Sequence, residues 1–109
     1  MKASQWLKAI EAACRQQFPG KPLRCEVTRS TRVKVRIEIG QDVLADLFFR
    51  EETGRTDYTL IVNGERLYGL DNLGTWHEHP IGNPGLHIPV EEPSPEEALR
   101  RLRVVADKL

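Results

Sequence analysis

The residues best suited to chemistry lie close together near the end of this 109-residue chain. All three histidines, His77, His79 and His87, fall between Asp71 and Pro89. The same stretch opens with an Asp-Asn pair and contains several glycines and prolines. Helix and strand cores do not need histidine, so this grouping indicates a functional site in a polar, histidine-rich loop.

The first interpretation of these residues is a metal site. His77 and His79 are two residues apart, so on an extended segment both side chains point the same way. His87 could return from beyond a glycine-containing turn, and Asp71 or Glu78 could supply an oxygen. Three imidazoles and a carboxylate suit zinc or a similar divalent metal that keeps an open position for water.

The second interpretation needs no metal. Neutral and protonated imidazoles act as base and acid near neutral pH, so His77 and His79 could cleave RNA at a ribose 2′-hydroxyl. In this hypothesis His87 and Asp71 are also catalytic, because they orient the pair. The candidate contacts to phosphate and bases are basic or aromatic residues, namely Arg66, Tyr68, Trp76, Arg32, Lys34 and Arg36.

The third interpretation is purely structural. The pair Asp71-Asn72 is typical of an Asx turn that ends a strand. Trp76 could close the end of a sheet with its indole N–H bonded, and the histidines could hydrogen-bond carbonyl groups of the loop. The sequence leaves all three interpretations open.

Size and composition narrow the class of protein. The length fits a single domain over residues 1–109, and no apolar run reaches membrane-spanning length. The N-terminus lacks the apolar stretch of a signal peptide, which predicts a cytoplasmic protein. We expect its two cysteines, Cys14 and Cys25, to be small buried side chains of a protein in a reducing compartment.

The charge is zero overall but unevenly distributed. Residues 15–36 contain seven basic side chains and one acid, whereas residues 37–109 contain fourteen acids and seven basic side chains. Such asymmetry could steer an anionic partner such as RNA to one face. The alternative is that Lys34, Arg36 and Glu38 form the solvated face of a strand.

The hydrophobic pattern predicts an α+β fold. We expect a helix over residues 4–18 with Ser4 as its cap, and a second helix that starts at Ser94-Pro95-Glu96-Glu97, a typical capping box. Between them we expect a four- or five-stranded antiparallel meander, because apolar and polar residues alternate and turns such as Asn63-Gly64 are short. The predicted strands cover residues 23–28, 33–39, 43–50, 58–62 and 66–70, followed by a loop over 71–93.

This layout resembles the TumE-like small toxins of prokaryotic toxin–antitoxin pairs. The residues that carry the resemblance are Leu67-Tyr68-Gly69-Leu70-Asp71-Asn72, then His77-Glu78-His79-Pro80, then His87. The resemblance implies a cytoplasmic toxin that is made beside a DNA-binding antitoxin. Gly69 stands where that family usually has an arginine, a place that Arg66 could fill.

Three functions are consistent with these features. The first is a toxin-like protein that acts on RNA, which makes the chain a candidate ribonuclease. The second is a non-enzymatic protein-interaction domain, because the apolar stripe of the predicted C-terminal helix exceeds what a small sheet covers. A homodimer formed through an edge strand would be a related case. The third is a metal-binding protein that uses His77, His79 and His87.

Overall fold

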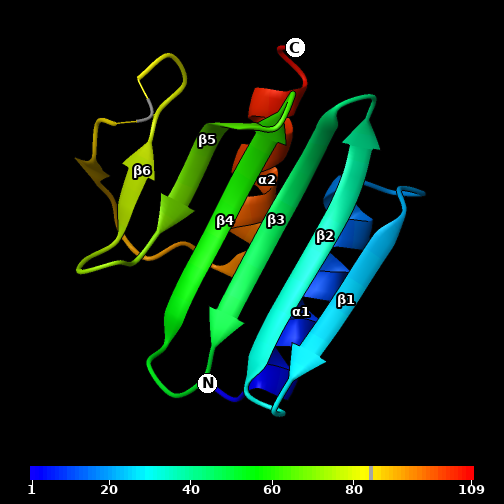
Figure 1. Ribbon diagram of the computed structural model, residues 1–109, viewed down its shortest axis with the longest axis vertical. Coiled ribbons are helices and arrows are strands. Elements are labelled where there is room, and N and C mark those ends of the chain that lie inside the picture. Colours follow the sequence, from blue (N-terminus) through cyan, green and yellow to red (C-terminus); the bar gives the residue numbers. More distant parts are fainter. Residues whose placement is uncertain (84) are drawn as a thin grey trace.

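The computed structural model describes residues 1–83 and 85–109, which form two helices and one antiparallel sheet of seven strands (Figure 1). The strands are hydrogen-bonded in the order of the sequence, so the sheet is an open meander. Pro84, in the glycine-containing turn expected before His87, lies outside the described residues. The elements are α1 (Ala3–Gln17), β1 (Leu23–Thr28), β2 (Arg32–Gly40), β3 (Val43–Arg50), β4 (Arg55–Val62), β5 (Glu65–Asp71), β6 (His77–His79), β7 (Ile88–Pro89) and α2 (Pro95–Ala106).

The predicted α+β class and antiparallel meander are confirmed, but the predicted number of strands is too low. Strands β1–β5 occupy the five predicted positions to within a few residues. Strands β6 and β7 lie in the segment 71–93, which was expected to be a loop. Hydrogen bonding to β5 organises this segment, and its polar side chains give no apolar alternation that would mark a strand.

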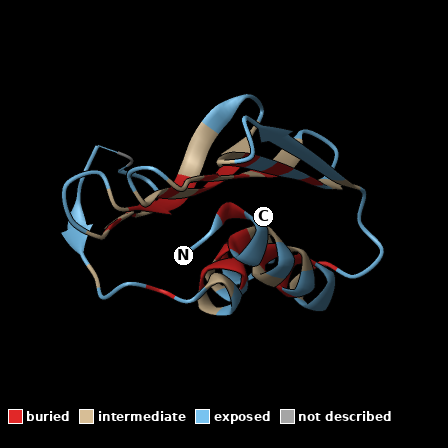
Figure 2. Ribbon diagram, turned by 90° about the horizontal axis from the view of Figure 1, so that it is seen from below, coloured by how far each residue is buried: buried red, intermediate tan, exposed pale blue. Residues whose placement is uncertain are grey.

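Both helices pack on the same face of the sheet, and no helix of the described chain covers the other face (Figure 2). The core lies between the two layers. Trp6 of α1 stacks on Phe49 and Tyr58, with ring centroids 5.2 and 6.3 Å apart. Leu99 and Leu102 of α2 are fully buried. The alternation along the strands therefore places mostly polar side chains on the uncovered face, together with the apolar Leu44, Phe48 and Ile61.

The start of α1 differs from its prediction. The helix begins at Ala3, so Ser4 lies inside it and does not cap it. The N–H of Lys2 donates to Gln5 Oε1 at 3.0 Å, and the N–H of Ala3 donates to the Glu51 carboxylate at 2.7 Å. An acidic residue far away in the sequence, in the β3–β4 turn, therefore accepts a hydrogen bond from a main-chain N–H that has no partner within the first turn of α1.

The start of α2 agrees with its prediction in two of three features. Ser94 Oγ accepts a hydrogen bond from the Glu97 N–H at 3.1 Å, and Pro95 occupies the first helical position. The Glu97 carboxylate does not close a capping box, because it binds Arg100 and Arg101. Neither helix of the described residues is long and apolar enough to cross a membrane.

The apolar stripe of α2 is used inside the molecule. Ala98, Leu99, Leu102 and Val105 are all buried in the core. Of the other two members of the predicted stripe, Ala106 is half-buried and Leu109, beyond the end of α2, is exposed. The four helical residues in the core therefore give no support to an interaction domain built on α2.

The two cysteines have different surroundings. Cys14 of α1 is buried, as expected, but Cys25 of β1 is exposed. The prediction that both are buried is wrong for Cys25, because β1 is an edge strand that the helices leave mostly uncovered.

Candidate functional site

Asp71 ends β5 and supplies the carboxylate at the middle of the site. Its Oδ1 accepts a hydrogen bond from the Leu73 N–H at 3.0 Å, as expected for an Asx turn. The neighbouring Asn72 accepts from the Thr56 N–H at 2.8 Å and donates to the Gly54 carbonyl at 2.9 Å, which anchors the turn. Asp71 is thereby fixed on the uncovered face of the sheet and is only 4% exposed.

Strand β6 places two histidines beside this carboxylate. Its register pairs His79 with Gly69 and His77 with Asp71, so both rings lie on the same face as Asp71. His77 Nε2 lies 3.0 Å from Asp71 Oδ1, and His79 Nε2 lies 2.9 Å from Asp71 Oδ2. Each carboxylate oxygen therefore faces a different imidazole.

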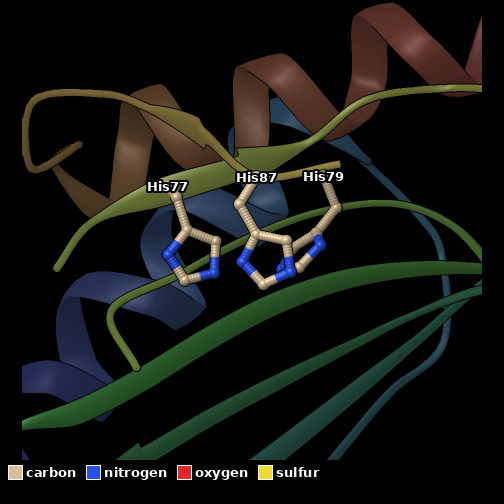
Figure 3. A group of neighbouring side chains, drawn as sticks. All are labelled: His77, His79 and His87. Atoms are coloured by element: carbon tan, nitrogen blue, oxygen red, sulfur yellow. The ribbon is translucent and has the colours of Figure 1, made fainter. Parts of the chain in front are cut away.

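His87, just before β7, completes the group (Figure 3). Its ring centroid lies 4.5 Å from that of His77 and 4.5 Å from that of His79. One ring nitrogen from each histidine lies within 4.8 Å of the other two. We call Asp71, His77, His79 and His87 the histidine centre. His77 and His79 are buried and His87 is exposed, so the centre meets solvent on the side of His87.

The partners of His77 restrict where its protons can be. Its Nδ1 lies 2.8 Å from the Thr75 carbonyl oxygen, which can only accept, so Nδ1 carries a hydrogen. In a neutral ring Nε2 then holds a lone pair, and this atom lies 3.0 Å from an oxygen of Asp71. The lone pair of Nε2 then faces the carboxylate, so the gap between these two atoms suits a shared proton or a bound cation.

The surroundings of Asp71 favour its ionised form. Burial raises the pKa of Asp71, but the Leu73 N–H and the His79 ring, together with the charges of both histidines, lower it more. The net pKa of Asp71 lies below its usual value. The Arg66 guanidinium adds positive charge nearby, with Nη1 4.0 Å from Asp71 Oδ2.

The Arg66 side chain lies over Gly69 on β5, and the tighter neighbour of this glycine is the main chain of β4. A Cβ atom on Gly69 would lie 3.7 Å from Arg66 Nε and 3.2 Å from the Tyr58 carbonyl oxygen. Arg66 Nη2 also donates to Thr59 Oγ1 at 3.2 Å, which holds the guanidinium over the sheet. An arginine therefore lies beside the histidine centre even though position 69 is glycine.

Tyr68, Trp76 and Glu78 lie away from the centre. Tyr68 Oη donates to the Glu78 carboxylate on the helix-covered side of the sheet. Trp76 stacks on Tyr58 at 6.2 Å on that same side, and its indole N–H donates to Glu92 at 3.3 Å. The expectation that Tyr68 and Trp76 stack on a base beside the histidines is therefore corrected. Glu78 is likewise removed from the candidate metal ligands.

A hollow of about 580 Å³ lies on the uncovered face, and Arg66 connects it to the histidine centre. Arg36 crosses this face to bind Asp46 through two hydrogen bonds of 2.8 and 3.0 Å. Arg32 is not among the lining residues. The charged lining residues are the basic Arg24, Lys34, Arg36 and Arg66 and the acidic Glu26, Asp46 and Asp57.

Comparisons of the chain with family models, with curated proteins and with solved structures find no match. The resemblance to TumE-like toxins therefore stays a prediction, and the function must be inferred from the site itself.

Proposed function

We propose that the protein binds a divalent transition-metal ion at the histidine centre, with His77, His79, Asp71 and His87 as ligands. The observation that carries the proposal is the pair of imidazole nitrogens, each 2.9 to 3.0 Å from one oxygen of a single buried carboxylate. Ligand atoms around a tetrahedral zinc ion lie roughly 3 to 3.5 Å apart. These three side chains could thus accept an ion with small shifts, and His87 would have to move closer.

The groups around the ligands support the same proposal. The Thr75 carbonyl fixes the hydrogen of His77 on Nδ1, which leaves Nε2 for a metal. The Leu73 N–H orients the carboxylate of Asp71. Imidazole ligands suit zinc, copper, iron and nickel. These four ligands fill a tetrahedral site, so water or a substrate oxygen would take a fifth position on the solvent side, beside the exposed His87, where the metal would activate or polarise it. The reaction class that we infer is metal-assisted hydrolysis.

A competition titration tests the metal site. Untagged protein is titrated with Zn²⁺ against a chromophoric chelator, and one ion per chain is expected. Asp71→Asn and His79→Ala should each weaken binding by about tenfold or more, since outer partners of metal ligands alone contribute that much. Glu78→Gln is the matched control, because Glu78 lies between the two histidines but faces the helices. Unchanged zinc affinity in Asp71→Asn and His79→Ala would contradict the proposal.

A second candidate is metal-free cleavage of RNA by His77 and His79 as acid and base. Arg66 favours it, because a guanidinium beside Asp71 could hold a phosphate close to both rings. Total RNA is incubated with the wild type and with a His77→Ala/His79→Ala double variant, each with and without EDTA. Cleavage that resists EDTA and is lost in the double variant supports this candidate, whereas equal RNA integrity rejects it.

The antitoxin partner belongs to this second candidate. A DNA-binding protein encoded beside the chain would be expected to co-purify with it when the two are co-expressed. Separate elution of the two proteins in size-exclusion chromatography would count against the toxin hypothesis.

A further inference from the structure

The two edges of the sheet differ in how they are protected. Strand β7 is only two residues long and ends in Pro89, which has no N–H to offer a partner. Strand β1 is six residues long, contains no proline, and forms the other edge of the sheet (Figure 1). Val27 of β1 is 51% exposed. The β1 edge is therefore free to accept another strand.

Alternate residues of β1 direct their main-chain groups outward. The Glu38 N–H of β2 donates to the Pro22 carbonyl at 3.1 Å. The same ladder continues along β1, so the N–H and C=O groups of Arg24 and Glu26 point toward β2. In an antiparallel ladder the residues between these turn their N–H and C=O groups the other way. Leu23, Cys25 and Val27 thus present a row of donors and acceptors for which the described part of the chain shows no partner.

We propose that β1 pairs antiparallel with β1 of a second copy of this chain, about a twofold axis at Cys25. This register places Leu23 opposite Val27 of the second copy and Arg24 opposite Glu26 of the second copy. Every outward N–H and C=O group of Leu23, Cys25 and Val27 then has a partner. The two Arg24–Glu26 pairs lie on the uncovered face, and the two Leu23–Val27 pairs lie on the helix side.

The charges of β1 select this register among its neighbours. A shift of two residues in one direction places Arg24 opposite Arg24, and a shift in the other direction places Glu26 opposite Glu26. Like charges directly opposite each other destabilise a pair of strands. A shift of one residue would place each side chain of one strand opposite a side chain on the other face of the sheet. Leu23 and Val27 would then no longer pack against each other. The strand is therefore self-complementary in one register.

A charge swap tests the proposal. Sedimentation velocity across a wide range of protein concentration should show a monomer–dimer equilibrium for the wild type. Arg24→Glu and Glu26→Arg should each shift it to monomer, because each places like charges opposite each other. The Arg24→Glu/Glu26→Arg double variant should restore the dimer. Lys8→Glu is the control for Arg24→Glu, because it changes the net charge by the same amount at an exposed position of α1.

Cross-linking tests the register independently. In a Cys14→Ala background, Cys25 lies opposite its copy at the twofold axis. Paired α-carbons about 5.5 Å apart are within disulfide range. An added oxidant that takes two electrons from the two thiols, which also lose two protons, should yield a covalent dimer. Arg24→Glu in the same background should not give one.

Three outcomes would overturn the proposal. These are a wild type that stays monomeric, single charge variants that dimerise as well as the wild type, and a dimer that does not cross-link through Cys25. None of these measurements depends on the metal site, because strands β2 to β5 separate β1 from β6 in the sheet.

Discussion

Asp71 connects groups that are separate in the sequence. Its carboxylate contacts the Leu73 N–H and the rings of His77 and His79, and the Arg66 guanidinium lies 4.0 Å away. A buried and ionised group with this many partners is costly to neutralise, because the partners stay buried without it.

Replacement of Asp71 should therefore destabilise the fold. Asp71→Asn is expected to lower the free energy of unfolding by about 1 to 3 kcal/mol, measured by urea denaturation in the presence of EDTA. Asp46→Asn is the control. Its ion pair with Arg36 is exposed, and such pairs contribute about 1 kcal/mol at most. Equal losses in the two variants would show that Asp71 has no special structural role.

The two thiols should react at very different rates. Burial, then the neighbouring Cys25 thiol and Glu11, raise the pKa of Cys14 to about 12, and Cys14 is buried. Burial raises the pKa of Cys25 as well, but Cys25 is exposed. A colorimetric thiol reagent should label one cysteine in the folded protein and both in denaturant. Cys25→Ser should abolish native labelling, and rapid labelling of two thiols in the native state would contradict this.

The sequence predicted the members of the histidine centre from residue type, but it did not predict which neighbours share their face. Tyr68 and Asp71 are three positions apart on β5, so alternation places them on opposite faces. That rule would have excluded Tyr68, but it would also have excluded Arg66, which reaches the face of Asp71 because the register shifts between Leu60 and Ile61. The distances between rings from different strands cannot be found this way, because they depend on the register of β6 against β5.

Among the elements, the predictable ones have apolar residues at a clear period. Strand β3 was predicted to its exact bounds, because Leu44, Phe48 and other apolar residues fill a central strand. Strand β6 was missed because its two histidines face one side and Glu78 faces the other. Its stability comes from main-chain pairing and polar side-chain contacts, which hydropathy does not detect.

The helix starts provide a paired test. Ser94→Ala removes the hydrogen bond to the Glu97 N–H and should lower stability by about 1 kcal/mol. This corresponds to a fall in Tm of roughly 4 to 8 °C for a domain of this size. Ser4→Ala should leave Tm unchanged or raise it slightly, because Ser4 is an exposed residue inside the first turn of α1 and alanine favours helix. A similar fall in Tm in both variants would contradict this and would indicate that Ser4 caps α1.

At the scale of the whole molecule, ion pairs link α2 to the sheet. Arg101 lies 3.1 Å from the Glu97 carboxylate and 3.6 Å from that of Glu78 on β6. Hydrogen bonds from Arg100 and Arg101 lower the pKa of Glu97 from 4.5 to about 2. A carboxyl group whose pKa is lower in the folded state stabilises the fold above its unfolded pKa and loses this effect as the pH falls.

The contribution of the Glu97 carboxylate to the stability of the fold should be present at neutral pH and lost in acid. The Tm of the wild type should exceed that of Glu97→Gln at neutral pH, and the gap should close as the pH falls from about 4.5 to about 2. The gap should be modest, because exposed ion pairs contribute about 1 kcal/mol or less. Glu65→Gln, on the exposed start of β5, should follow the wild type. A gap that is constant with pH would contradict the role of these ion pairs.

The molecule thus has a helix-covered face that holds the core and an uncovered face that holds the histidine centre and the charged hollow. The centre lies beside β6 and the free β1 edge lies at the far side of the sheet. Pairing through β1 would therefore leave the histidine centres of both copies open.

Zinc X-ray absorption spectroscopy on stoichiometrically loaded protein tests the central claim most directly. The proposal predicts a shell of nitrogen and oxygen ligands at about 2.0 to 2.2 Å, with the multiple scattering of imidazole rings. His77→Ala and His79→Ala should each reduce this scattering. Zinc that is lost on dialysis of the wild type, or that is bound through the cysteine sulfurs at about 2.3 Å, would contradict it.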